Sequence, residues 1–217
     1  MRPISNIVDA TNYAMLEVGE PLHAFDYDVL VQRAGGGTPT IITRTAKAGE
    51  RLTTLDGVER KLDSSTVLVC DTVGALSIAG IMGGAETEVS ENTRNVLLEG
   101  AAWNFINIRK TAQAQNLPSE ASYRFSRGVH PAMAERGVRR GLELMRLWAG
   151  VDFAEGLVDY YPLPPAHPQV EINPDDVQRW LGISLGAEQI ADLLKRLEFQ
   201  VELDGNVVRA ATPDHRL

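Results

Sequence analysis

The chain has 217 residues, of which 44% are hydrophobic and 23% charged, so it can bury a core and does not have a disordered composition. Its net charge of −8 by itself disfavours nucleic acid as a partner. It has no run of about eighteen apolar residues and no basic leader before an apolar core, so we expect a cytoplasmic protein without a membrane span. The single cysteine, Cys70, fits a reducing cytosol and is interpreted as a core residue.

The first predicted element is a helix that begins at Pro3 and ends at Gly19. Apolar residues recur on one side of this segment, and glycine is a stop signal for a helix. Thr11 lies on the apolar stripe and Asn12 borders it. The next residues, 20–28 (EPLHAFDYD), are predicted to form a loop.

Strands are predicted over the apolar stretches that follow, which are residues 40–46, 61–70, 74–84 and 95–103. The dipeptide Asp56-Gly57 predicts a tight hairpin, since these residues adopt the backbone conformation that such a turn requires.

Helical signals dominate the next part of the chain. Asn104 is a suitable N-cap for a helix over 105–116. Residues 117–131 (LPSEASYRFSRGVHP) are interrupted by proline and glycine, so we expect a loop of the kind that is shaped to hold something. Pro131 then opens a long helix, which Gly150 ends.

A proline-rich stretch at 160–168 separates a second unit, in which we predict a strand, two helices and a final strand, with Asn173 as the cap of the first helix. The sequence therefore predicts an α+β fold: a strand-rich domain with packed helices over 1–160, a linker over 161–167, and a small mixed helical and strand domain over 168–217. The chain stops straight after a strand, and we expect it to be a piece of a longer protein.

The charges are unevenly distributed along the chain. Residues 1–103 hold 8 basic against 14 acidic residues, a balance of −6, and residues 150–217 hold 5 against 12, a balance of −7. Residues 104–149 hold 8 against 3, a balance of +5. This basic segment is either a solvated helix face or a local contact for phosphate, since Lys and Arg provide most non-specific affinity for nucleic acid.

The residues by themselves name no reaction. The histidines and the cysteine show no metal-ligand spacing, and no phosphate-binding loop or serine-nucleophile motif is present. GIMGG at 80–84 is either a tight turn or a backbone that a ligand approaches closely. Glu99 lies in an apolar strand, where a carboxylate either faces water, the more common case, or is paired. His23 is either a structural loop residue or a catalytic one.

Four stretches extend the interpretation. RPISNIVDATNYAMLEVGEPLHAFD, SIAGIMGGAETEV, NVLLEGAAWNFINIRKTA and SEASYRFSRGVHP, in this order and spacing, closely resemble the beta subunits of bacterial phenylalanyl-tRNA synthetases. The stretches cover most of residues 2–131. The resemblance implies that this region is an editing domain, which hydrolyses tyrosine wrongly attached to the phenylalanine tRNA. Residues 168–217 resemble the small domain that follows it.

The resemblance also implies site residues. Thr11, Asn12 and His23 would act on the ester or position water, and Glu99 would recognise the tyrosine hydroxyl. The rest of the substrate pocket would consist of Gly83, Gly84, Ser119 and Ala121. The family usually has threonine where this chain has Ser119, which keeps the hydroxyl and loses a methyl group. The tRNA acceptor end would be placed by Arg109, Lys110, Arg124 and Arg127.

The implied partners are the phenylalanine tRNA, the edited tyrosine and the synthetase alpha subunit, in a parent enzyme of two alpha and two beta subunits. We expect no metal or other cofactor in this chain, whereas the parent synthetase would use Mg²⁺ and ATP. The alternative is a non-catalytic module that binds tRNA or serves as a scaffold in the synthetase.

Overall fold

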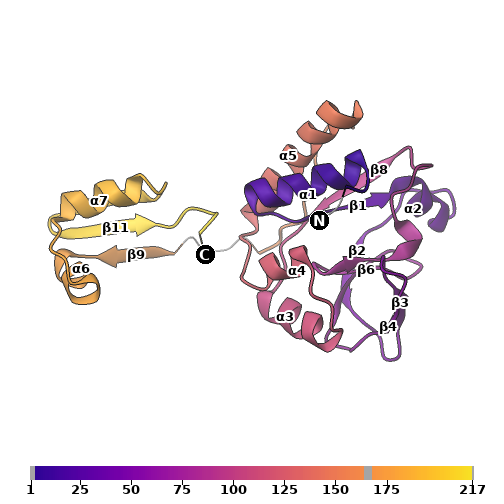
Figure 1. Ribbon diagram of the computed structural model, residues 1–217, viewed down its shortest axis with the longest axis horizontal. Helices are drawn as coiled ribbons and strands as arrows, with labels where there is room; N and C mark the ends of the chain where they lie inside the picture. Colours follow the sequence, from indigo (N-terminus) through magenta and orange to yellow (C-terminus); the bar gives the residue numbers. More distant parts are fainter. Residues whose placement is uncertain (1–2, 164–167, 217) are drawn as a thin grey trace. The chain divides into compact units, whose positions relative to one another are not determined.

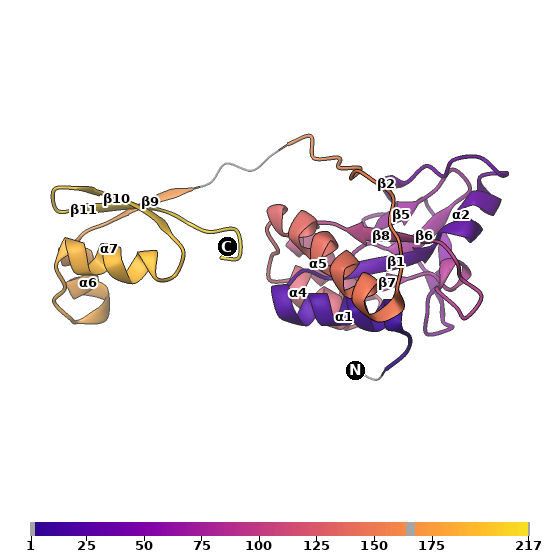
Figure 2. The ribbon, with the colours of Figure 1, turned by 90° about the horizontal axis from the view of Figure 1, so that it is seen from above.

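The computed structural model describes residues 3–163 and 168–216, which form two compact units, 1–156 and 157–217. Each unit combines helices with antiparallel sheets (Figures 1 and 2), so the predicted α+β class is confirmed. The predicted linker at 161–167 lies partly outside the described residues, because 164–167 are not among them. No helix in the described ranges is long and apolar enough to cross a membrane.

The first unit is built around a two-stranded antiparallel ribbon of β1 (Leu22–Asp26) and β8 (Val96–Gly100). Two helices, α1 (Asn6–Val18) and α5 (Ala132–Ala149), lie side by side and contact this ribbon (Figures 1 and 2). Buried residues from both helices, Ala10 and Ala14 of α1 with Leu144 and Met145 of α5, form the core between them.

Helix α1 starts later than predicted. Ser5 is its N-cap, and its side-chain oxygen accepts a hydrogen bond from the Val8 amide at 3.2 Å. A serine side chain satisfies a free amide of the first turn, which Pro3 cannot do. The predicted end at Gly19 is confirmed, with a left-handed φ of 82° that glycine adopts without strain.

The loop predicted over 20–28 is wrong, because this segment contains β1 and the start of α2 (Tyr27–Arg33). The pairing partner of β1 is β8, which lies far along the sequence, so no local pattern reveals the pairing. Asp26 ends the strand and caps α2, since its Oδ1 accepts a hydrogen bond from the Val29 amide at 3.1 Å.

A second sheet of the first unit has the strand order β2-β5-β6-β7. Its strands are β2 (Ile42–Thr45), β5 (Val67–Cys70), β6 (Ala75–Ile78) and β7 (Met82–Gly83), and a 3-10 turn follows at Ala85–Thr87. The hairpin predicted at Asp56-Gly57 is confirmed and joins β3 (Arg51–Thr53) to β4 (Glu59–Lys61). The single strand predicted over 61–70 is interrupted, because Asp63 forms a turn by accepting a hydrogen bond from the Ser65 amide at 2.7 Å.

Two shorter helices close the first unit, α3 (Phe105–Ala114) and α4 (Glu120–Phe125). The N-cap predicted at Asn104 is confirmed. The prediction that 117–131 is not one continuous helix is confirmed. The segment is not entirely a loop, however, because it contains the short helix α4, which Ser119 caps. The buried side chains of α3 and α4 pack on the second sheet, and Leu68, Ile78 and Phe125 are all exposed by 2% or less.

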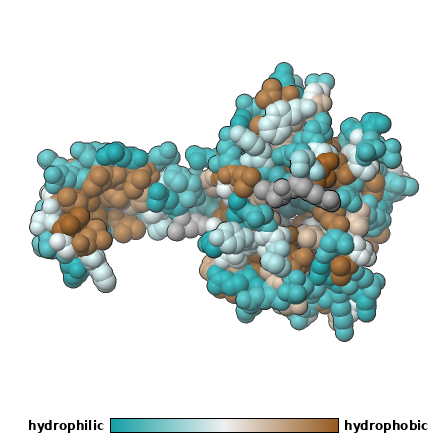
Figure 3. Space-filling view, viewed as in Figure 1, coloured by the Kyte–Doolittle hydropathy of each residue, from teal (hydrophilic) through white to brown (hydrophobic). Residues whose placement is uncertain are grey.

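The second unit has the elements β9 (Gln169–Ile172), α6 (Pro174–Leu181), α7 (Ala187–Lys195), β10 (Gln200–Asp204) and β11 (Val207–Ala211). The strands form a sheet in the order β10-β11-β9, and β10 is an element that the sequence did not predict. The cap predicted at Asn173 is confirmed. A small core around Ile190 and Val208 holds the unit together, and apolar residues gather on the face of it shown in Figure 3.

The two separate cores predict separate effects of core substitutions. Leu68→Ala should destabilise the first unit by about 2–5 kcal/mol, whereas Ile190→Ala should destabilise only the second, because each leaves a cavity in its own core. Hydrogen exchange followed residue by residue in the 217-residue chain measures both effects. Faster exchange throughout the chain after either substitution would contradict the division into two cores.

Candidate functional site

A cavity lies on one side of the β1–β8 ribbon. It has an empty volume of about 390 Å³, which includes open solvent at its mouth. The lining comes from β1 and β8, from the β6–β7 connection, and from α4. The lining residues are Pro21, Leu22, His23, Ser77, Gly80, Ile81, Met82, Gly83, Glu99, Trp103, Ala121 and Phe125. The structure thus brings four of the predicted site residues, His23, Gly83, Glu99 and Ala121, around one space.

His23 and Glu99 face each other across the ribbon, because the strand register pairs these two residues directly. Within the described part of the chain, neither the Nε2 atom of His23 nor the Oε2 atom of Glu99 has a hydrogen-bond partner, and both atoms are buried. Glu99 as a whole is partly exposed, but its Oε2 atom neither faces water nor is paired within the described residues, so neither alternative describes this atom. Buried polar atoms without partners are costly and rare, so these two side chains are candidates for binding a ligand.

Burial changes the charge of both side chains. Loss of hydration raises the pKa of Glu99 from 4.5 to about 7, because the ionised carboxylate is disfavoured away from water. The same cause lowers the pKa of His23 from 6.5 to about 4. At neutral pH the imidazole is therefore uncharged, and the carboxyl group of Glu99 is close to half ionised.

The two predicted pocket glycines are explained by the protein's own atoms. A Cβ atom on Gly83 would lie 2.7 Å from Nε2 of His23, so only glycine lets the imidazole ring lie against this backbone. A Cβ atom on Gly84 would lie 2.5 Å from the carbonyl oxygen of Leu76, and Gly84 is not part of the cavity lining.

Ser119 supports the cavity wall without lining it. Its Oγ atom donates a hydrogen bond to the carbonyl oxygen of Ile81 at 2.8 Å and accepts one from the Ser122 amide at 3.0 Å. The hydroxyl group therefore holds the start of α4 against the β6–β7 connection, and Ala121 follows in the wall. A hydroxyl is required for this contact, which serine supplies as well as threonine.

Thr11 and Asn12 lie on α1 and do not line the cavity. The Thr11 side chain is buried, and its Oγ1 atom donates a hydrogen bond to the carbonyl oxygen of Val8 at 2.7 Å. The expectation that Thr11 shares a cleft with Glu99 is therefore not met by the structure.

Sequence reasoning missed the apolar wall of the cavity and a second buried acid. Trp103 and Phe125 supply much of the wall, but nothing in the sequence distinguishes them from core residues. Glu20 is fully buried, and neither of its carboxylate oxygens has a hydrogen-bond partner among the described residues. Its side chain fits beside α5 because residue 137 is glycine, where a Cβ atom would lie 2.5 Å from Cγ of Glu20.

Burial, with a smaller contribution from the nearby Glu99 carboxylate, raises the pKa of Glu20 from 4.5 to about 8. The Ala101 amide opposes this by favouring the ionised form, although it makes no well-formed hydrogen bond with the carboxylate. Glu20 is therefore a neutral acid at pH 7.

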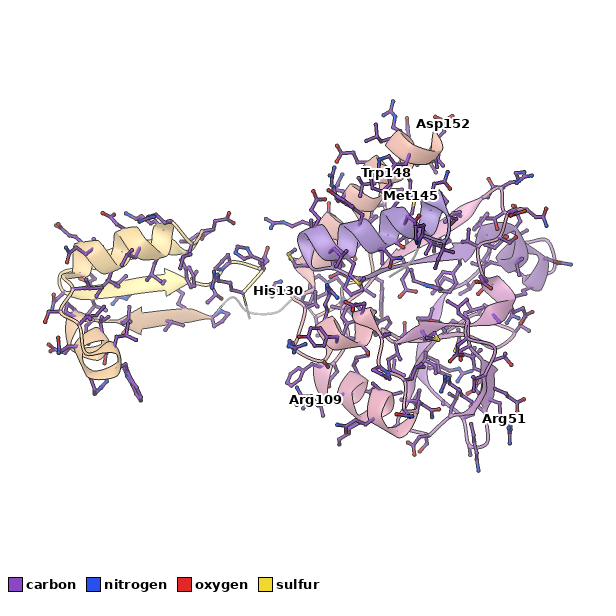
Figure 4. The ribbon with its side chains drawn as sticks, in the orientation of Figure 1. Arg51, Arg109, His130, Met145, Trp148 and Asp152 are labelled. Carbon is purple, nitrogen blue, oxygen red and sulfur yellow. The ribbon has the colours of Figure 1, made fainter. Side chains whose placement is uncertain are left out.

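The predicted basic cluster lies on α3 and around α4. Arg124 forms an ion pair with Glu120 at 2.7 Å. Arg109, at the outer edge of α3 (Figure 4), donates a hydrogen bond to the Ser126 carbonyl at 2.8 Å, and Arg127 donates one to the Tyr123 carbonyl at 3.0 Å. Lys110 is exposed on α3. Arg109 and Arg127 thus cap the end of α4. Their partners are uncharged carbonyl groups, so these hydrogen bonds do not neutralise the two guanidinium groups.

The chain is similar to known proteins along its length. Residues 1–150 match the family model described as the B3/4 domain, and residues 170–217 match the tRNA synthetase B5 domain. The chain is 42% identical to the phenylalanine–tRNA ligase beta subunit of Moorella thermoacetica over 94% of its own length and 25% of that protein. It is 44% identical to the same subunit of Dehalococcoides mccartyi over 92% of its length and 24% of that protein.

Among solved structures, an N-terminal fragment of the phenylalanyl-tRNA synthetase beta subunit from Pyrococcus horikoshii matches 97% of this chain and 60% of that fragment. The sequence identity is 16% and the TM-score is 0.45. The chain spans about a quarter of the length of the curated relatives it matches.

The burial of Glu20 predicts a pH-dependent loss of stability. The folded chain holds a proton on Glu20 up to about pH 8, and the unfolded chain releases it near pH 4.5, so stability falls as the pH rises between these values. Glu20→Gln removes this loss and should stabilise the chain at pH 8, relative to pH 4.5, by on the order of 4 kcal/mol. Urea unfolding of the original chain and of Glu20→Gln at the two pH values measures this difference in stability. Glu91→Gln, which changes an exposed glutamate, is the control. Equal pH dependence in all three chains would contradict the assignment.

Proposed function

We propose that this chain, which belongs to the B3/4 domain family, carries the site that hydrolyses tyrosine from the phenylalanine tRNA within a phenylalanine–tRNA ligase beta subunit. The observation that carries the proposal is the buried carboxyl group of Glu99, which has an unpartnered oxygen beside a largely apolar cavity. The names of the curated relatives support the enzyme to which the site would belong.

Recognition of tyrosine follows from the chemistry of Glu99. Tyrosine and phenylalanine differ by one hydroxyl group, and an apolar pocket distinguishes them poorly. The phenol donates a hydrogen bond to the carboxylate, whereas phenylalanine would leave the carboxylate buried and unpaired. An unsatisfied buried group costs about 1–3 kcal/mol, and more if it is charged, so the cavity would retain tyrosine in preference to phenylalanine.

Hydrolysis requires a water molecule directed at the ester carbonyl. The oxygen of that water forms the new bond to carbon, the bond to the ribose oxygen breaks, and tyrosine and the tRNA hydroxyl are released. His23 is neutral at pH 7, so its Nε2 atom can accept a hydrogen bond from this water. A pKa near 4 makes His23 a weak base, which favours positioning of the water over complete removal of its proton.

The remaining predicted site residues act indirectly in this proposal. Thr11 and Asn12 belong to α1, which contacts β1, and would help to hold the strand that carries His23. Gly83 gives the imidazole its place, and Ser119 holds the wall that contains Ala121. The described residues contain no group of three His, Cys, Asp or Glu side chains that could hold a metal ion, and no step of the proposal uses one.

The proposed partners are those of the parent enzyme. The chain would act on a phenylalanine tRNA charged elsewhere in the enzyme with ATP and Mg²⁺, together with the alpha subunit in an assembly of two alpha and two beta subunits. Arg109, Lys110, Arg124 and Arg127 would attract the acceptor end of the tRNA, since they belong to the segment with a charge balance of +5, from 8 basic and 3 acidic residues over 104–149.

Removal of the Glu99 carboxylate should abolish the preference for tyrosine. In the parent enzyme, Glu99→Ala should slow the release of tyrosine from tyrosyl-tRNA by roughly 10- to 100-fold, because the contact with the tyrosine hydroxyl is lost. The attachment of phenylalanine should be unchanged, because that reaction would take place in the alpha subunit. Deacylation assays with tyrosyl- and phenylalanyl-tRNA measure the effect.

Glu99→Gln serves as the graded control, since it keeps the size and one acceptor oxygen and should show an intermediate defect. The exposed Glu91→Ala controls for removal of a carboxylate elsewhere. If Glu99→Ala slowed both deacylation reactions equally, Glu99 would support the fold or the water and would not recognise tyrosine.

The raised pKa of Glu99 predicts that binding of tyrosine depends on pH. The phenol favours the ionised carboxylate, so the affinity for free tyrosine, relative to phenylalanine, should rise several-fold from pH 6 to pH 8 around a midpoint near 7. His23 does not titrate in this range, and Glu20→Gln removes the buried acid whose carboxylate interacts with that of Glu99. Calorimetry at several pH values tests this, and a constant ratio would contradict it.

A further inference from the structure

Helix α4 has one side on the cavity and another side in solvent. Ala121 and Phe125, which are four residues apart, line the cavity. Tyr123 lies between them in sequence, and a helix turns about 200° over two residues, so its side chain leaves the helix on the opposite side. Tyr123 is 58% exposed. Tyr123 therefore presents its ring to solvent on the side of α4 that faces away from the cavity.

The Tyr123 ring carries a guanidinium group that is already in place. The central carbon of the Arg127 guanidinium lies 3.4 Å from the centre of the ring, and Arg127 also donates a hydrogen bond to the Tyr123 carbonyl at 3.0 Å. Both contacts hold the guanidinium group of Arg127, so the stacked pair exists before any ligand binds.

Helix α3 contributes a second pair of the same kind. The guanidinium of Arg109 lies 5.8 Å from the centre of the Phe105 ring, and Phe105 is 44% exposed. Arg109 also donates a hydrogen bond to the Ser126 carbonyl at 2.8 Å, which links this pair to the end of α4. We refer to Phe105, Arg109, Tyr123 and Arg127 as the aromatic–arginine platform.

The platform keeps its positive charge. Neither Arg109 nor Arg127 forms an ion pair with a carboxylate within the described residues, whereas Arg124 beside them is paired with Glu120. Two aromatic rings and two free guanidinium groups on one surface match a single-stranded nucleic acid, whose bases stack on both kinds of plane and whose phosphates need neutralising.

We propose that the aromatic–arginine platform stacks a base of the single-stranded RNA end whose aminoacyl ester enters the cavity, with Tyr123 as the central stacking residue. This inference rests on the proposed function, because the function supplies the RNA. It adds how the RNA is held: the cavity side of α4 meets the amino acid, and the solvent side of the same helix meets a neighbouring nucleotide.

The test is the binding of a fluorescent tetranucleotide with the sequence ACCA to the 217-residue chain. Tyr123→Ala should weaken binding by roughly 5- to 100-fold with an unchanged dependence on salt, because stacking and not charge is lost. Tyr123→Phe should stay within about twofold of the original affinity, since it keeps the ring. Arg127→Gln should weaken binding and lower the salt dependence by about one ion. Tyr160→Ala, which removes a tyrosine that is 89% exposed elsewhere, is the matched control.

Equal binding by the original chain and Tyr123→Ala would overturn the proposal, as would absence of any binding by the original chain. Loss of binding in Tyr123→Phe as well would also overturn it, because the hydroxyl and not the ring would then be the contact. Binding of free tyrosine by the original chain is a separate measurement. Its absence would contradict the proposed function, while the RNA measurements would still decide about the platform.

Discussion

The pairing of β1 with β8 is the interaction on which the candidate site depends. The two strands lie more than seventy residues apart in sequence, and their register places His23 directly opposite Glu99. A shift of either strand by one residue would turn the side chain of that strand to the other side of the ribbon, so that His23 and Glu99 would no longer share the cavity. The register is held from the opposite side by α5, whose Gly137 and Gly141 let Glu20 and Leu22 lie against the helix backbone. Packing of α5 on one side of the ribbon thus fixes the positions of His23 and Glu99 on the other side.

This arrangement is costly for the fold. Glu20, His23 and Glu99 each bury a titratable atom without a hydrogen-bond partner in the described part of the chain, and each has its pKa moved towards the neutral form. Natural proteins accept such local destabilisation mainly where function requires it. For His23 and Glu99 the proposed function supplies such a requirement, since two polar groups beside a largely apolar cavity remain available to a substrate. Glu20 faces α5 instead, and its neutral form leaves Glu99 as the acid that ionises first.

Local signals in the sequence were sufficient for the hairpin and for several helix ends, whereas α2 begins in, and α4 lies in, a segment that was predicted to be a loop. Gly19, Asn104 and Asn173 mark helix ends through caps that act within one turn, and the structure has each of them. The strands β1 and β10 were missed because their pairing depends on partners that no local pattern identifies. The resemblance to synthetase beta subunits supplied His23, Gly83, Glu99 and Ala121, which the structure gathers around one cavity. Glu20 could not be predicted, since an isolated glutamate beside a proline normally lies in water.

The central claim is that Glu99 reads the hydroxyl group of tyrosine. The most direct measurement is a crystal structure of the 217-residue chain soaked with tyrosine and, in parallel, with phenylalanine. The account predicts tyrosine in the cavity of the β1–β8 ribbon, with its phenol oxygen within hydrogen-bond distance of the Glu99 carboxylate, and weaker or no density for phenylalanine at the same concentration. Tyrosine bound with its phenol directed away from Glu99, or equal occupancy by the two amino acids, would contradict it.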